Sequence, residues 1–326
     1  MRVLVTGGAG FVGSACLRHL LRHGVEAVAY DNLSQGHRQA VPADRLIVGD
    51  IADASAVEHA LRQVKADAVM HFAAATYVGE SVTDPEFHYR NNIGGTLSLL
   101  NAMRRSGVKR MLFSSTCATY GMNPKVPMAE DSAQEPFSPY ARTKLAVEWM
   151  IRDFAHAYGL GFTILRYFNA AGAEPDGSHG EDHRPENHLI PLVLEVPLGK
   201  RNHIAVYGND YPTPDGTCIR DYVHIHDLAE AHLLAIRATT PDTAEVFNIG
   251  TGTGHSVLEV IRACERVTGK PIPMKVVERR PGDPPALVAD PSKIQRVLGW
   301  ALKFSSLDAV VETAWKWHQS HPKGYA

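Results

Sequence analysis

The sequence has 326 residues, 44% of them hydrophobic, which suffices for one large domain or two smaller ones around a substantial core. Its 35 acidic residues against 33 lysines and arginines give a formal net charge of -2, which excludes the strong positive field that non-specific nucleic-acid binding needs. No apolar run reaches membrane-spanning length, and the strand-like run Val3–Val5 leaves no room before it for a targeting peptide. We therefore expect a cytoplasmic protein without nucleic-acid or membrane partners.

The first half of the chain alternates short β-branched runs with longer stretches of helical periodicity. The runs typical of buried strands are Val3–Val5, Ala27–Tyr30, Leu46–Val48, Ala68–Phe72, Met111–Ser114 and Thr163–Arg166. The amphipathic stretches between them are Val12–His23, Ala54–Gln63, Pro85–Arg105 and Tyr140–Tyr158. Repeated strand–helix–strand units predict an α/β protein with a Rossmann-type, doubly wound parallel sheet.

The character of the sequence changes after Asn169. Residues 171–191 are rich in Gly, Pro, Asp, Glu and His, and the pattern stays irregular until another buried-strand run appears at Val246–Ile249. We predict a first domain of residues 1–169, with a further strand from near 220–250. A smaller, discontinuous domain would comprise residues 170–219 and 251–326.

A glycine-rich turn follows the first predicted strand and opens the first predicted helix, with Gly7, Gly10 and Gly13 three residues apart. Glycine permits a tight turn and a close approach of the backbone to a pyrophosphate, whose charge then meets the positive end of the helix. We assign these glycines, with Phe11 and Val12, to a dinucleotide site. Taken alone, the same spacing is also found in ordinary glycine turns.

The second predicted strand ends at Asp31. A carboxylate there can accept hydrogen bonds from both hydroxyls of an adenosine ribose and would repel a 2′-phosphate, which favours NAD over NADP. The alternative interpretation is a helix cap. The residues assigned with Asp31 to the cofactor site follow the second, third and fourth strands at the same sheet edge: Asn32, Leu33, Ser34, Asp50, Ile51, Phe72, Ala73 and Ala74.

Tyr140 and Lys144 stand four residues apart in a predicted helix, so both project from one face. A phenol with a pKa of about 10 is a poor base near neutrality, but an adjacent ammonium and a positive nicotinamide ring favour the phenolate. Thr116 follows the fifth predicted strand at the ligand edge of the sheet, where its hydroxyl would orient a substrate oxygen toward Tyr140. These three residues are our candidates for catalysis.

The order of these motifs resembles that of the extended short-chain dehydrogenases, and within them the UDP-glucose 4-epimerases. The resemblance extends over essentially the whole chain. Its most specific runs are His71-Phe72-Ala73, Val78-Gly79-Glu80-Ser81, Asn91-Asn92, Arg166-Tyr167-Phe168-Asn169, Tyr207-Gly208-Asn209-Asp210-Tyr211 and Arg220-Asp221-Tyr222-Val223-His224.

The resemblance implies an NAD-dependent inversion of carbon 4 in a UDP-sugar through a transient 4-keto sugar. Tyr140 would be the base, Thr116 its hydroxyl partner and Lys144 the cofactor anchor. Asn91 and Phe168 would contact NAD in the first domain. The residues that would hold uridine and diphosphate are Asn169, His188, Leu189, Ala205, Val206, Tyr207, Arg220, Arg280 and Asp283; arginines give charge-assisted contacts to a pyrophosphate.

Three positions depart from the commonest pattern of that family. Thr116 stands where many members have serine, which keeps the hydroxyl. Thr76 replaces a lysine often found near the cofactor, so NAD would be held less firmly. Leu287 replaces a large aromatic residue found in some members beside the sugar's 2-position, and we hypothesise that N-acetylated UDP-hexoses are also substrates. A UDP-xylose/UDP-arabinose epimerase is the nearest alternative, and the sequence does not separate it from a hexose epimerase.

Other functions fit the sequence less well. A 4,6-dehydratase would need a carboxylate pair after the catalytic hydroxyl, where Cys117 and Ala118 stand. A non-catalytic NAD-sensing protein would be expected to lose Tyr140 or Lys144. The His224-Ile-His-Asp227 run fits strand alternation without a third metal ligand, and the four cysteines lack CxxC spacing, so we predict no metal site and reduced thiols. The resemblance further implies a homodimer through helices near 86–106 and 140–157.

Overall fold

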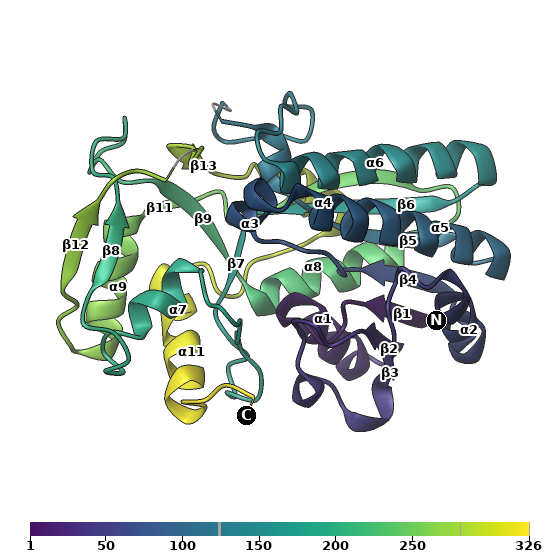
Figure 1. Cartoon of the computed structure of the whole chain (residues 1–326), viewed down its shortest axis with the longest axis horizontal. Helices are drawn as coiled ribbons and strands as arrows, with labels where there is room; N and C mark the ends of the chain where they lie inside the picture. Colours follow the sequence, from purple (N-terminus) through teal and green to yellow (C-terminus); the bar gives the residue numbers. More distant parts are fainter. Residues whose placement is uncertain (123–124, 281, 326) are drawn as a thin grey trace.

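A seven-stranded parallel sheet forms the centre of the larger part of the molecule (Figure 1). The computed structural model describes residues 1–122, 125–280 and 282–325. The strands are ordered β10-β6-β5-β4-β1-β2-β3, and every neighbouring pair is parallel, as predicted. Their bounds are β1 Arg2–Thr6, β2 Glu26–Asp31, β3 Leu46–Val48, β4 Ala68–His71, β5 Arg110–Thr116, β6 Gly161–Tyr167 and β10 Ala244–Ile249.

Helices cover both faces of this sheet, because side chains along each strand alternate between the faces. Val3 and Val5 pack into a core with α1 and α8, whereas Leu4 packs into a second core with α2, α5 and α6. The bounds of these helices are α1 Phe11–Arg22, α8 Ile225–Ala238, α2 Ala54–Val64, α5 Gly95–Ser106 and α6 Pro139–Tyr158. Among the described residues, no helix combines the length and hydropathy needed to cross a bilayer.

The single helix predicted over Pro85–Arg105 is divided in the structure. A short helix α3 (Val78–Thr83) precedes α4 (Pro85–His88), which continues through a π-helical turn at Tyr89–Gly94 into α5. Asn92 lies in this turn. Its side-chain amide donates hydrogen bonds to the Ala75 carbonyl at 3.0 Å and to the Thr143 hydroxyl at 2.9 Å. The irregular turn therefore connects the loop after β4 with α6, which hydrophobic periodicity alone does not reveal.

In the described residues, the smaller part of the molecule contains two small sheets and the helices that pack on them (Figure 1). In one sheet, β9 (Ile219–His224) pairs with β7 (Asn169–Ala171), β11 (Gly254–Ser256) and β13 (Ala286–Leu287). In the other, β8 (Ile204–Tyr207) pairs with β12 (Met274–Val277). The helices α7 (Leu189–Leu194), α9 (Val257–Thr268) and α11 (Leu307–Ser320) share a third core with these strands, while α10 (Ser292–Leu298) packs on the large sheet.

The segment from His224 to Asp227 crosses a strand–helix boundary, so the strand alternation predicted for it is wrong. His224 ends β9, and its ring accepts the His226 N–H at 3.1 Å at the start of α8. The Asp227 carboxylate accepts the backbone N–H groups of Lys303 and Phe304. These hydrogen bonds give the segment a packing role, because helix starts favour side chains that accept free backbone N–H groups.

Candidate active site

The glycine turn lies between β1 and the start of α1, and Gly7 and Gly13 are among its positions that require glycine. Gly7 has φ +70°, and a Cβ there would lie 2.5 Å from the backbone nitrogen of Ala73. A Cβ on Gly13 would lie 2.1 Å from the Gly7 carbonyl oxygen. Glycine at these positions therefore lets the turn pack closely against the loop after β4 and against the first turn of α1, which begins at Phe11 and Val12.

Asp31 ends β2 beside this turn. Its carboxylate accepts the N–H groups of Ala9 at 2.9 Å and Leu33 at 2.8 Å. Burial raises the pKa of Asp31, and these two hydrogen bonds oppose the shift. Asn32 donates to the Asp50 carboxylate at 3.0 Å and accepts the Ser34 N–H, so the predicted residues after β2 and β3 lie together at one sheet edge.

The loop after β4 packs against the glycine turn. Phe72 and Ala73 both donate their N–H groups to the Thr6 carbonyl oxygen at the end of β1. Ala74 follows them. Strand β4 ends at His71, one residue earlier than predicted. Asn91 donates to the side-chain oxygen of Asn92 at 3.0 Å. Asn92 received no role from the sequence, although the Asn91-Asn92 run contains it. We infer that it positions the cofactor loop.

Thr116 and Tyr140 meet at the carboxyl end of β5, and both side chains are buried. The helix carrying Tyr140 begins at that place because Ser138 accepts the Ala141 N–H at 3.2 Å and Pro139 occupies the first turn. Burial raises the pKa of Tyr140, and the neighbouring Thr116 hydroxyl opposes the rise.

Lys144 lies one turn further along α6 and is 3% exposed. Its ammonium donates to the Ser114 carbonyl at 2.6 Å and stands 4.7 Å from the centre of the Phe113 ring. Burial lowers the pKa of Lys144 to about 7, against the opposing attraction of the Glu148 carboxylate. The predicted tuning of Tyr140 by Lys144 stays a prediction.

A buried polar network behind these residues was missed by the sequence analysis. Glu148 pairs with Arg166 at 2.6 Å and accepts the Ser115 hydroxyl at 2.6 Å. The Ser114 hydroxyl bonds the Tyr167 hydroxyl at 2.6 Å, and burial raises the pKa of Tyr167 to about 12. Arg166 and Tyr167 belong to the Arg166–Asn169 run that carries the family resemblance. For Glu148, the only signal in the sequence is its spacing of one helical turn after Lys144, which puts it on the same face of α6.

Leu287 and Arg220 are register partners on β13 and β9. Leu287 is buried in a small cluster with Cys117 and Phe168. Cys117 follows Thr116 in the sequence, and Phe168 follows the last residue of β6. Arg220 pairs with Asp283 and donates to the Ile219 carbonyl at 2.7 Å. The structure thus places Arg220, predicted to contact the diphosphate, and Leu287, predicted to lie beside the sugar, on adjacent strands.

The other predicted nucleotide residues lie on three further segments. Arg280 places its guanidinium 4.0 Å from the centre of the half-exposed Tyr207 ring at the end of β8. On β8, Val206 points its side chain into the core, so only its backbone is available to a ligand, and Ala205 is half-buried. Asn169 begins β7.

His188 and Leu189 stand at the start of α7. The Nδ1 atom of His188 lies 2.8 Å from oxygens of both Glu181 and Glu186, two residues without a predicted role.

The sequence pattern of the NAD dependent epimerase/dehydratase family matches residues 3–250. The chain belongs to this family. This epimerase/dehydratase is 48% identical to a UDP-glucose 4-epimerase of Halalkalibacterium halodurans, with 100% of this chain and 98% of the relative aligned. It is 50% identical to a UDP-glucose 4-epimerase of Streptomyces lividans, covering 99% of this chain and 98% of the relative.

Solved structures give the same result for the fold. A UDP-glucose 4-epimerase from Brucella ovis in complex with NAD has a TM-score of 0.93 at 48% identity, over 96% of this chain and 97% of that one. The Bifidobacterium longum enzyme in complex with NAD+ and UDP has a TM-score of 0.94 at 37% identity, over 99% and 100%. The predicted doubly wound fold and family resemblance are confirmed, while the roles of single residues in this epimerase/dehydratase stay predictions.

Proposed function

We propose that this protein is a UDP-glucose 4-epimerase that interconverts UDP-glucose and UDP-galactose with bound NAD. The observation that carries the proposal is the buried Thr116–Tyr140 pair, with Lys144 one helical turn away, at the carboxyl end of β5. That edge also carries the glycine turn and Asp31. Family membership over the full length supports the same reaction.

The residues at the sheet edge fit NAD. Gly7 and Gly13, where a Cβ would strike backbone atoms, keep the turn tight at the amino end of α1, where we propose that the pyrophosphate binds. The Asp31 carboxylate suits ribose hydroxyls and disfavours a 2′-phosphate. The remaining residues proposed to hold NAD are Gly10, Phe11, Val12, Asn32, Leu33, Ser34, Asp50, Ile51, Phe72, Ala73, Ala74, Asn91, Lys144 and Phe168.

Bound NAD would supply reversible redox chemistry, because it can accept a hydride from carbon 4 of the sugar and give it back. Tyr140 removes the proton of the 4-hydroxyl and later returns it, and the Thr116 hydroxyl orients the sugar oxygen between them. Lys144, as an ammonium, favours the phenolate. The resulting 4-keto sugar has lost its stereochemistry, so rotation about the bonds to the diphosphate presents its other face.

A firm hold on the nucleotide permits this rotation. Arg220 and Arg280 are proposed to contact the diphosphate with charge-assisted hydrogen bonds. Asp283, already paired with Arg220, would orient that guanidinium. The other proposed contacts to the UDP moiety come from Asn169, His188, Leu189, Ala205, Tyr207 and the backbone of Val206.

The test is to incubate purified protein, without added NAD, with UDP-galactose and to follow the nucleotide sugars by chromatography. Conversion to UDP-glucose supports an epimerase that retains its cofactor. If conversion requires added NAD, the weaker hold predicted from Thr76 is supported. No epimer under either condition would overturn the proposed reaction.

Substrate range is a second question at the same site. Leu287 is 8% exposed and packs beside Cys117 and Phe168, next to the catalytic threonine. We propose that its modest size leaves room for an N-acetyl group at the sugar's 2-position. Parallel incubations with UDP-GalNAc and UDP-arabinose test this. Absence of UDP-GalNAc turnover removes the idea, and faster turnover of the pentose would favour the pentose epimerase.

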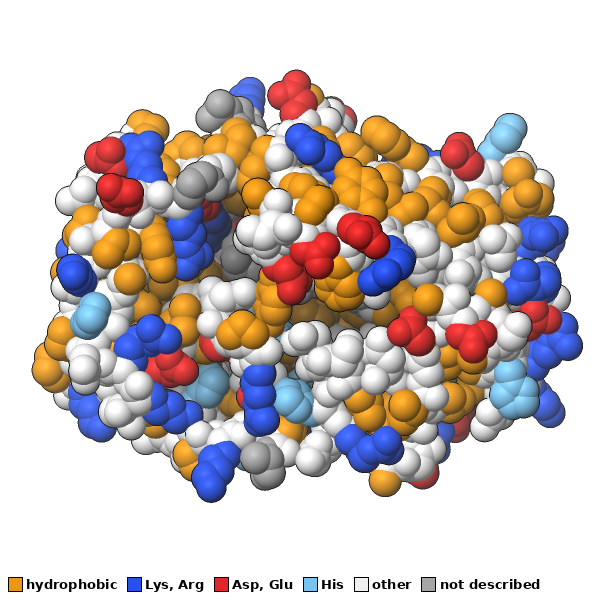
Figure 2. All heavy atoms as spheres, viewed as in Figure 1, with side chains coloured by type: hydrophobic (Ala, Val, Ile, Leu, Met, Phe, Trp, Pro, Cys, Tyr) orange, Lys and Arg blue, Asp and Glu red, His pale blue; other side chains and the backbone are white. Residues whose placement is uncertain are grey.

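We propose a homodimer through the face formed by α4, α5 and α6. Large hydrophobic side chains are exposed there, including Phe87 at 37%, Leu97 at 43% and Trp149 at 58%. Figure 2 shows hydrophobic side chains gathered over this region of the molecule. Exposed apolar area of this kind commonly marks an interface. Light scattering that gives the mass of one chain would reject the dimer.

A further inference from the structure

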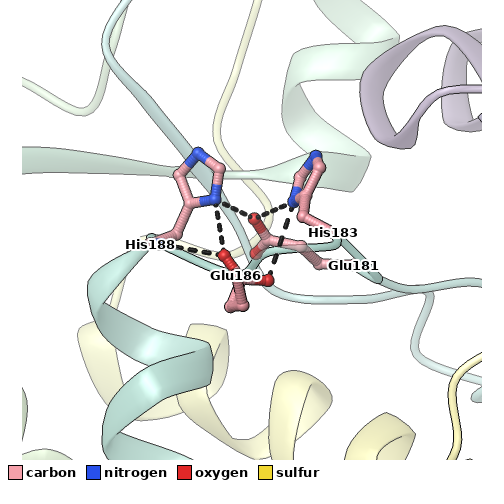
Figure 3. A group of neighbouring side chains, drawn as sticks. All are labelled: Glu181, His183, Glu186 and His188. Carbon is pink, nitrogen blue, oxygen red and sulfur yellow. Dashed lines mark hydrogen bonds and ion pairs between the residues drawn. The ribbon is translucent and has the colours of Figure 1, made fainter. Parts of the chain in front are cut away.

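Four side chains of the loop between β7 and α7 point toward one another (Figure 3). Glu181, His183, Glu186 and His188 each offer one ligand atom, and these atoms lie within 4.8 Å of one another. Both imidazoles turn Nδ1 toward the carboxylates, and their other ring nitrogens point away. From the sequence we predicted no metal site, because the His224–Asp227 run offered no third ligand; the cluster formed by these four residues was not predicted.

The separations between these atoms are close to those of a tetrahedral metal site. Nδ1 of His188 lies 2.8 Å from an oxygen of each glutamate. Nδ1 of His183 lies 3.1 Å from Glu181 and 3.6 Å from Glu186. Zinc bonds of about 2.0–2.1 Å in tetrahedral geometry place ligand atoms about 3.4 Å apart. The separations from His188 would therefore have to lengthen by about 0.6 Å to seat the ion, and those from His183 would change by about 0.2–0.3 Å.

Burial and charge also favour a cation at this point. The Glu181 and Glu186 side chains are only 5% and 13% exposed, and two neighbouring carboxylates are costly to bury without compensating charge. Nδ1 of His183 is buried and faces both carboxylates without a well-aligned hydrogen bond to either. A divalent ion would neutralise both carboxylates in place of protons on the two imidazoles, which otherwise pair with them.

We propose that Glu181, His183, Glu186 and His188 bind one Zn²⁺ ion. Two imidazoles with two carboxylates suit zinc, whereas magnesium and calcium prefer oxygen ligands throughout. Four protein ligands leave no position for substrate, so the site is structural rather than catalytic. A cavity of about 410 Å³, lined in part by Lys200 and His318, opens beside the cluster and provides an entry path.

The ion would fix a loop that touches the proposed cofactor and nucleotide residues. The His183 ring lies edge-on to Phe11 at the start of α1, with 6.3 Å between ring centres. Tyr77, in the segment after β4, donates its hydroxyl to the Pro185 carbonyl at 3.1 Å. His188 immediately precedes Leu189 and α7. One bound ion would hold the start of α7 against the large sheet.

The test is the metal content of protein purified with its affinity tag removed, measured by inductively coupled plasma mass spectrometry. We expect one zinc per chain, or the uptake of one zinc by chelator-treated protein. The zinc affinity of E186Q and H183N, measured by competition with a chromogenic chelator, should fall by at least about 100-fold. Wild-type protein that neither contains nor takes up zinc overturns the proposal.

A matched control removes a carboxylate from a different histidine cluster. Glu230 lies 2.6 Å from His19, near His23, and E230Q should leave the zinc content and affinity unchanged. Loss of zinc from E230Q alone would place the metal elsewhere and overturn the assignment. If the loop variants do not fold, anomalous scattering at the zinc edge from wild-type crystals locates the ion directly. These readouts do not depend on epimerase activity.

Discussion

Substitutions of Thr116 can test whether its hydroxyl oxygen contributes to turnover. T116S keeps the hydroxyl that opposes the raised pKa of Tyr140, so we expect kcat to change little. T116V keeps the shape of the side chain and removes the hydroxyl, and kcat should fall by about 10²-fold or more. Steady-state kinetics with UDP-galactose compares them. Equal activity of the two variants would contradict the role of the hydroxyl, provided that both retain NAD.

The buried Arg166–Glu148 pair predicts an asymmetric response to substitution. Both side chains are at most 3% exposed, so E148Q leaves an uncompensated guanidinium and should lower the free energy of unfolding by about 3–5 kcal/mol. E86Q removes the partner of Arg90 in an exposed pair and should change it by less than about 1 kcal/mol. Urea unfolding measures both. Similar losses in the two variants would show that burial does not set the cost.

Single residues also show where sequence reasoning stops. Tyr140, Lys144 and Thr116 could be chosen because their spacing and their positions after a strand or in a helix have direct chemical meaning. Val206 was assigned to the ligand, yet its side chain lies in the core, because a short strand gives no sign of which face is buried. Glu148 acquires its role only through contact with Arg166 on another element.

At the scale of elements, the glycine turn gives a prediction about close packing. G13A would bring a Cβ to 2.1 Å from a backbone oxygen, whereas a Cβ on Gly94 meets no atom of the described residues within 4 Å. We expect G13A to lose bound NAD and about 1–3 kcal/mol of stability, and G94A to keep both. Absorbance of released cofactor and thermal unfolding measure these effects. Retention of NAD by G13A would argue against the proposed pyrophosphate site.

The elements of the first half were predictable because each strand is buried on both faces and each helix is amphipathic. Strands β1, β2 and β5 lie within two residues of the expected bounds. The strands β7 and β13 are short, and together with β9 they exist through pairing with distant segments, as Asn169 pairs with Tyr222. Such pairing leaves no local period in the sequence. The same limit applies to the π-helical turn at Tyr89–Gly94.

At the scale of the whole molecule, buried histidines predict sensitivity to acid. Burial lowers the pKa of His71, His179 and His224 to about 3 and that of His232 to about 4. In the unfolded chain these groups titrate near about 6.5. Between those pH values the unfolded state binds more protons than the native state. The contribution of these histidines to the free energy of unfolding is therefore complete above about pH 6.5 and decreases as the pH is lowered.

The measurement is the urea midpoint between pH 6.5 and pH 4. H224F keeps an aromatic ring against Phe304 and removes one titrating group, so its stability should fall less steeply, by up to about 1.4 kcal/mol per pH unit. Its stability at pH 7 should be lower, by about 1–3 kcal/mol, since it loses hydrogen bonds to Thr313 and His226. Identical slopes would contradict the assigned neutral state of His224.

After β9, the chain goes back to the large sheet to form α8 and β10, and this order affects how the protein folds while the ribosome is still making it. Strand β10 closes the sheet beside β6, and α8 covers one of its faces, yet both follow β9 of the smaller part. A nascent chain that has left the ribosome only as far as β6 therefore exposes an unpaired strand edge and an uncovered apolar face. The ribosome must add about eighty further residues before that edge is paired, and at about 5–20 residues per second this leaves several seconds in which a chaperone has a surface to bind.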